Sequence, residues 1–71
     1  MVDMERLKSE LANSGMTMTA IADKSGISRE TLYNRLKGIG EFTASEIVGL
    51  STALHFSASD VRNIFLQSKG N

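Results

Sequence analysis

Half of the chain's basic side chains lie in one short stretch, ADKSGISRETLYNRLKG, at residues 22–38. An arginine guanidinium can bond both acceptor atoms of a guanine edge, and arginine and lysine also bind phosphate. Serine, glutamate, tyrosine and asparagine in the same stretch can contact other base edges. These side chains can act together only if the chain presents the stretch on one helix face. Its basic residues are Lys24, Arg29, Arg35 and Lys37.

The basic stretch stands out because the chain as a whole is neutral. Residues 24–38 carry a balance of +3, residues 1–23 a balance of −2 and residues 39–71 a balance of −1, so the formal net charge is zero. A zero sum argues mildly against nucleic acid, but the distribution of charge matters more than the sum. The chain is predicted to have one basic segment on an otherwise acidic body.

The periodicity predicts five short helices and no strand. Apolar residues recur at helical spacing over about 3–14, 17–24 and 28–37, and glycines follow each of these segments. Thr43 opens a T-x-x-E capping box and starts a fourth helix, and Ser57 starts a fifth. The chain has 71 residues, of which 41% are hydrophobic and none is proline. Such a composition suits one small all-α domain.

The second and third predicted helices have the spacing of a helix-turn-helix. Ala22 is small and allows close packing, and Gly26, four residues later, permits a sharp turn. Ile27 then points into the core, Ser28 caps the next helix, and Leu32 anchors the back of that helix. The outer face of the third helix is left free to enter a DNA major groove.

Residues 16–38, followed by a fourth helix and LSTALHFSASDV, resemble the Cro/repressor class of phage helix-turn-helix proteins. The segment FTASEIVGLSTALHFSASDVRNIFL resembles most the short Cro-like regulators of phages of Gram-positive bacteria. The resemblance covers nearly the whole chain. It implies a five-helix lambda-repressor-like domain over residues 1–71, with the helix-turn-helix at about 17–37. Residues 68–71 are expected to be a frayed tail.

Two positions depart from the family pattern. Met18 stands where many members have a glutamine that touches phosphate or base. The second apolar anchor of the third helix usually falls three residues after the first, but here that position is Arg35 and the anchor is Leu36. Residues three and four positions after Leu32 lie on the same helix face. We therefore expect the third helix to keep its packing against the core, with a slight rotation.

The third helix and the start of the second supply the candidate DNA contacts. A guanidinium makes Arg29 the leading base reader, and the full base-reading set is Ser28, Arg29, Glu30, Tyr33 and Asn34. Phosphate contacts position a protein without specifying sequence, and the candidates for them are Thr17, Thr19, Arg35 and Lys37.

Each candidate also has a purely structural interpretation. Ser28, Thr17 and Thr19 suit helix caps. The basic residues could form an ordinary solvated face, Glu30 could act only as a repulsive filter, and Tyr33 could pack over the first helix.

Two adjacent apolar residues near the C-terminus suggest a contact surface. Phe65 and Leu66 point about 100° apart on a helix, so they cannot both face the same core wall. At least one is expected to be partly exposed and to contact a second copy or a partner protein. Phe42, Phe56, Val61 and Ile64 are expected to complete the core.

Other chemistry is thinly represented. The chain has no cysteine, and His55 is its one histidine, so we expect no catalytic residue, cofactor or metal. We expect His55 to sit at the end of the fourth helix, where the helix dipole favours a polar or cationic group. No membrane-spanning run or signal peptide is recognisable, which predicts a cytoplasmic protein in a bacterial host.

The sequence thus predicts a transcriptional regulator rather than an enzyme. It should bind double-stranded operator DNA as a homodimer and repress or compete at a promoter in the choice between lytic and lysogenic growth. The alternative is a modulator or antirepressor that binds a partner phage repressor. The zero net charge and the surplus of C-terminal apolar residues fit that alternative.

Overall fold

The computed structural model describes residues 1–66 and folds them into helices without a strand. The helices are α1 (Met4–Asn13), α2 (Met18–Ser25), α3 (Arg29–Leu36), α4 (Ala44–Leu54) and α5 (Ala58–Phe65). The five-helix, all-α prediction is confirmed, and the first three helices match their predicted bounds within one residue at each end. The predicted frayed tail, residues 68–71, lies outside the described residues.

Every described helix begins at a side chain that caps it. In each case an oxygen of the capping side chain accepts a hydrogen bond from the backbone N–H three residues later, which stabilises the helix start by about 1 kcal/mol. The predicted capping box at Thr43 is confirmed, because the Glu46 carboxylate also accepts from the Thr43 N–H. The caps are Asp3, Thr17, Ser28, Thr43 and Ser57.

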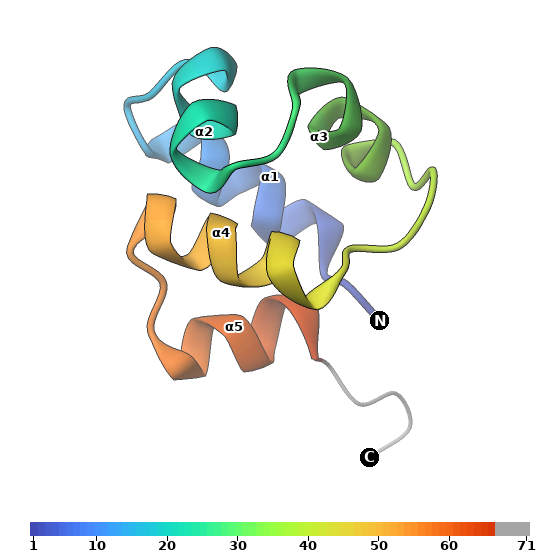
Figure 1. The fold of residues 1–71 in the computed structure, drawn as a ribbon. Helices are drawn as coiled ribbons and strands as arrows, with labels where there is room; N and C mark the ends of the chain where they lie inside the picture. The colour runs from blue at the N-terminus through green and yellow to red at the C-terminus, as the bar shows by residue number, and fades with distance from the viewer. Residues whose placement is uncertain (67–71) are drawn as a thin grey trace.

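The helices surround one apolar core (Figure 1). α2 and α3 lie at the top of the view, α4 lies below them with α1 behind it, and α5 lies at the bottom. Each helix contributes one of the largest fully enclosed side chains, so all of them share this core. These side chains are Leu7, Ile21, Leu32, Leu50 and Ile64.

The closest helix approach is between α2 and α4. A Cβ atom placed on Gly49 would collide with the backbone carbonyl oxygen of Ser25. Ser25 ends α2 and is buried, and its hydroxyl donates to the carbonyl of Ala22 at 3.1 Å. We expected close packing at Ala22 between the second and third helices. Ala22 is indeed buried, but α2 packs most extensively on α4.

The N-terminal segment is fastened to α5. The backbone N–H of Asp3 donates to the carbonyl of Ile64 at 2.7 Å. On the next turn of α1, the Arg6 guanidinium lies 2.8 Å from the Asp60 carboxylate. These contacts join the two ends of the described chain.

The C-terminal aromatic residue is part of the core. Phe65 is 4% exposed, and its ring meets that of Phe42 edge-on at 5.4 Å and that of Phe56 at 6.4 Å. Leu66 is 60% exposed. The expectation that the two residues diverge is confirmed. Phe65 cannot serve as the surface contact because these neighbouring rings enclose it.

Replacement of Gly49 by alanine should destabilise the fold. Alanine in a helix interior is ordinarily about 1 kcal/mol more favourable than glycine. Here, however, its methyl group would push α4 away from α2. Overpacking of this kind lowers the free energy of unfolding by about 1–3 kcal/mol. Urea denaturation of Gly49→Ala should show this loss.

The matched control is Val48→Ala, one residue away, because the Val48 side chain is 64% exposed. This exposed substitution should change the free energy of unfolding by at most about 0.5 kcal/mol. Equal or higher stability of Gly49→Ala would contradict the close approach.

Candidate nucleic-acid interface

The turn between α2 and α3 has the geometry that the sequence spacing predicted. Gly26 has a φ of 75°. This is the left-handed region, which glycine enters without strain. The N–H groups of Gly26 and Ile27 both donate to the carbonyl of Ala22, at 3.0 and 3.2 Å. The Ile27 side chain is buried, and Ser28 then caps α3. The chain therefore reverses tightly and starts α3 from a fixed point.

α3 has one buried side and one exposed side. Leu32 is fully buried, and Leu36 packs, half-buried, against the core. Four of the five predicted base readers lie on the exposed surface, and the fifth, Asn34, is half-buried. The exposed four are Ser28, Arg29, Glu30 and Tyr33.

Arg29 and Tyr33 lie one helical turn apart and are near neighbours. The guanidinium carbon of Arg29 is 6.0 Å from the centre of the Tyr33 ring. Tyr33 is 40% exposed and also lines a hollow of about 340 Å³ with residues of α1 such as Lys8 and Leu11. The ring thus faces a hollow beside α1 and still borders the exposed face of α3.

The predicted phosphate contacts at α2 are exposed polar residues near its N-terminus. Thr17 is the N-cap, and its hydroxyl accepts from the N–H of Ala20 at 3.1 Å. Thr19 lies in the first turn of α2 and is exposed. Lys37 is exposed at the C-terminal end of α3. All three are exposed to solvent.

Arg35 has a different environment from the one expected for a phosphate contact. Its Nε and Nη2 donate to the two carboxylate oxygens of Glu46 at 3.0 and 3.3 Å, and its Nη1 donates to the carbonyl of Ile39 at 3.2 Å. The two charged side chains are only 20% and 15% exposed. The guanidinium is therefore held between α3 and α4, and its charge is largely offset by Glu46.

The electrostatics of Glu46 reflect this arrangement. Burial acts to raise the pKa of its carboxyl, but the hydrogen bonds from Arg35 and from the backbone N–H of Thr43 outweigh burial. The net effect holds the pKa below its usual range. Glu46 is therefore ionised at neutral pH while bonded at once to α3 and to the start of its own helix.

The sequence interpretation did not find this ion pair. The available signal was the inward position of Arg35, three residues after Leu32, because a cation on a buried face needs an anion. Glu46, in the first turn of the next helix, was interpreted only as part of a capping box. His55 was expected at the end of α4, and it caps that helix in a left-handed conformation with a φ of 57°.

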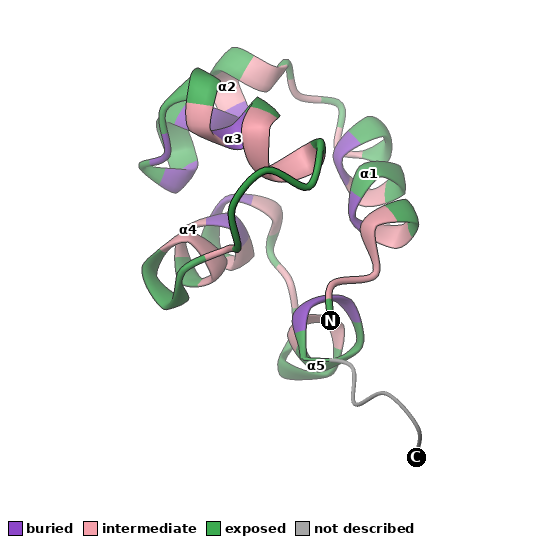
Figure 2. Cartoon of the chain, turned by 90° about the vertical axis from the view of Figure 1, so that its right-hand side faces the viewer, coloured by how far each residue is buried: buried purple, intermediate pink, exposed green. Residues whose placement is uncertain are grey.

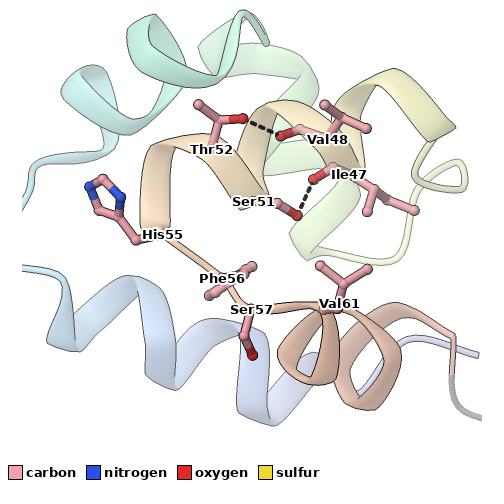
Figure 3. Close-up of a pocket in the computed structure, with 9 residues that line it drawn as sticks. Ile47, Val48, Ser51, Thr52, His55, Phe56, Ser57 and Val61 are labelled. Atoms are coloured by element: carbon pink, nitrogen blue, oxygen red, sulfur yellow. Dashed lines mark hydrogen bonds between the residues drawn. The ribbon is translucent and has the colours of Figure 1, made fainter.

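A groove of about 710 Å³ lies between α4 and α5 (Figure 3), and no residue of α3 lines it. Apolar side chains dominate its lining, including Ile47, Val48 and Val61. The hydroxyl groups of Ser51 and Thr52 donate to carbonyls of their own helix, at 2.6 and 3.0 Å. The remaining polar residues of the lining are His55 and Ser57.

Within residues 1–66, no three histidine or acidic side chains gather closely enough to hold a metal ion. The same part of the chain contains no helix with the length and apolar character required to cross a bilayer.

Comparison with protein families agrees with this geometry. A helix-turn-helix family model matches residues 7–61, which is most of the chain. The protein belongs to this helix-turn-helix family and is a DNA-binding transcriptional regulator. The matched range contains α2, the turn and α3. Searches of curated proteins and of solved structures returned no match.

Acid should destabilise the fold through two capping carboxylates. Hydrogen bonds from Ser57 and the charge of Arg6 lower the pKa of Asp60. The pKa of Glu46 is also lowered, by its bonds to Arg35 and Thr43. A carboxyl group whose pKa is lower in the folded than in the unfolded state stabilises the fold. This stabilisation is fully present above the unfolded-state pKa of about 4, and it is lost as the pH falls through the folded-state pKa. The free energy of unfolding should therefore decrease below about pH 4.

Glu46→Gln should show a shallower loss over that range than the parent, whereas the control Glu41→Gln, an exposed loop residue, should follow the parent. Urea titrations at several pH values measure the difference. An identical pH dependence in Glu46→Gln and the parent would exclude this role for Glu46.

Proposed function

We propose that the protein is a Cro-like repressor that binds operator DNA through α3 and competes at a promoter in a phage lytic–lysogenic switch. The observation that carries the proposal is the exposed face of α3. The opposite face holds the buried Leu32, and the helix begins directly after the turn at Gly26. A helix presented in this way can enter a major groove with its N-terminal residues toward the bases.

Within this face we assign base reading to the exposed residues of the first two turns. Arg29 is placed to bond a guanine edge, with Ser28, Glu30 and Tyr33 beside it. Asn34, which is half-buried, would contribute at the edge of this surface. Thr17, Thr19 and Lys37 would contact phosphates on either side and set the position of α3.

A homodimer would let two copies of α3 read one operator. Figure 2 shows the flank on which the exposed loop 37–41, the N-terminus and the end of α5 lie together. Leu66 and Phe42 line one hollow of about 350 Å³ on this flank, and Ile39 in the loop is 56% exposed. The flank is beside α3 rather than behind it, so a second copy there would leave both reading helices free.

The alternative function is that of a modulator or antirepressor that binds a partner phage repressor. The observation that favours it is the apolar groove between α4 and α5. Val48 lies at this groove, and its side chain is 64% exposed. A partner held in this groove would depend on apolar contact and would respond little to salt.

Alanine variants separate base reading from phosphate contact. On the duplex that the protein selects from a random pool, Arg29→Ala should weaken binding by about 1–3 kcal/mol and relax the preference at one base pair. Lys37→Ala should weaken selected and scrambled duplexes alike and reduce the salt slope by about 1. Fluorescence anisotropy measures both effects.

The control is Arg62→Ala, which removes an exposed positive charge from α5 and should change neither selectivity nor affinity by much. Unchanged binding in both Arg29→Ala and Lys37→Ala would show that α3 is not the reading element.

The dimer interface can be tested without DNA. Leu66→Gln removes an apolar side chain from the flank of each copy and should weaken self-association roughly a hundredfold, as expected from the loss of two buried leucines per dimer. Analytical ultracentrifugation measures the monomer–dimer equilibrium. Val48→Gln, an equally exposed apolar residue at the other groove, is the matched control and should dimerise like the parent. If Val48→Gln weakened self-association and Leu66→Gln did not, the dimer interface would instead lie at the groove between α4 and α5.

A further inference from the structure

α3 is held to the rest of the domain by few buried contacts. Leu32 is its one fully buried side chain, and Leu36 is half-buried at the hollow beside α1. An eight-residue helix with a single deep anchor can tilt about that anchor unless a second point is fixed. The position that would give an apolar anchor, three residues after Leu32, is occupied by Arg35.

Arg35 supplies the second fixed point by hydrogen bonding. Its guanidinium makes two parallel bonds to the Glu46 carboxylate and a third to the Ile39 carbonyl. Such bidentate pairs fix orientation as well as distance, because both groups are planar. Gly40 leaves the necessary space, since a Cβ at that position would collide with Nη1 of Arg35.

Glu46 is itself immobilised on α4. Its Oε1 accepts from the backbone N–H of Thr43 at 3.0 Å, and its own N–H donates to the Thr43 hydroxyl at 3.2 Å. One turn later, α4 is locked against α2 at Gly49. A continuous series of short contacts therefore connects α2, α4 and the C-terminal turn of α3.

We propose that Arg35 and Glu46 are positioning residues for DNA reading: their ion pair sets the orientation of α3 on the α2–α4 scaffold, and neither side chain contacts DNA. The inference rests on the proposed function, because it concerns the selectivity of the α3 surface. It assigns a role in DNA selectivity to an acidic residue, although removal of a negative charge should otherwise favour binding to phosphate.

The test compares Glu46→Gln, Arg35→Met and Arg35→Lys with the control Glu5→Gln, which removes an exposed carboxylate from the first turn of α1. Glutamine at position 46 can keep the capping bond to Thr43, so that helix should still form. Affinity for the selected and a scrambled duplex is measured by anisotropy at several salt concentrations. Residual dipolar couplings of backbone amides, recorded without DNA, report the orientation of α3 relative to α4.

We expect all three variants at positions 35 and 46 to reorient α3 and to lose selectivity roughly tenfold, the discrimination of about one base contact. Their salt slopes should match the parent, and Glu5→Gln should keep both orientation and selectivity. Full selectivity in Glu46→Gln, or a loss of binding with α3 unmoved, would overturn the proposal. Loss of binding in Arg35→Met that Arg35→Lys restores would overturn it too, because that pattern marks a phosphate contact.

The proposed function and the positioning role of the ion pair can be disproved separately. If the parent protein selects no duplex but α3 still reorients in Glu46→Gln, the ion pair is a positioning device and the proposed DNA-reading function is wrong. If the parent selects a duplex and α3 stays in place in every variant, the function stands and the positioning role is wrong.

Discussion

The close approach of α4 to the C-terminal end of α2 is the constraint on which the rest of the domain depends. It exists because Gly49 has no side chain where the Ser25 carbonyl oxygen meets α4. Immediately after Ser25 the chain turns at Gly26 and enters α3. The start of α3 is therefore fixed by a backbone contact, and its far end is fixed to the same α4 through Arg35 and Glu46. A close backbone contact thus holds one end of this short helix, and an ion pair holds the other.

The ion pair also changes the charge that the protein can offer to DNA. Residues 24–38 carry a formal balance of +3, but Glu46 offsets Arg35, so Lys24, Arg29 and Lys37 against Glu30 leave +2. A neutral chain with so small a basic surface attracts DNA weakly over long distances. Affinity would then depend on short-range base contacts and on the pairing of two copies, which makes the orientation of α3 especially important.

Local features of the fold could be predicted from the sequence because they are encoded by neighbouring residues. Ser28, Thr43 and Ser57 mark helix starts through bonds to groups three residues away, and Gly26 marks the turn. Features that join distant segments were not predictable in this way. The role of Gly49 depends on Ser25, and that of Arg35 depends on Glu46. The burial of Phe65 follows from two rings that lie outside its own helix.

The central claim is that this protein alone recognises DNA by sequence through α3. The most direct measurement is the salt dependence of anisotropy for the unmodified protein on a selected and a scrambled duplex. We expect tight binding to the selected duplex, at least about a thousandfold weaker binding to the scrambled one, and a steep decrease of both with salt. Equal binding to both duplexes, or none, would contradict it and would direct attention to the groove between α4 and α5.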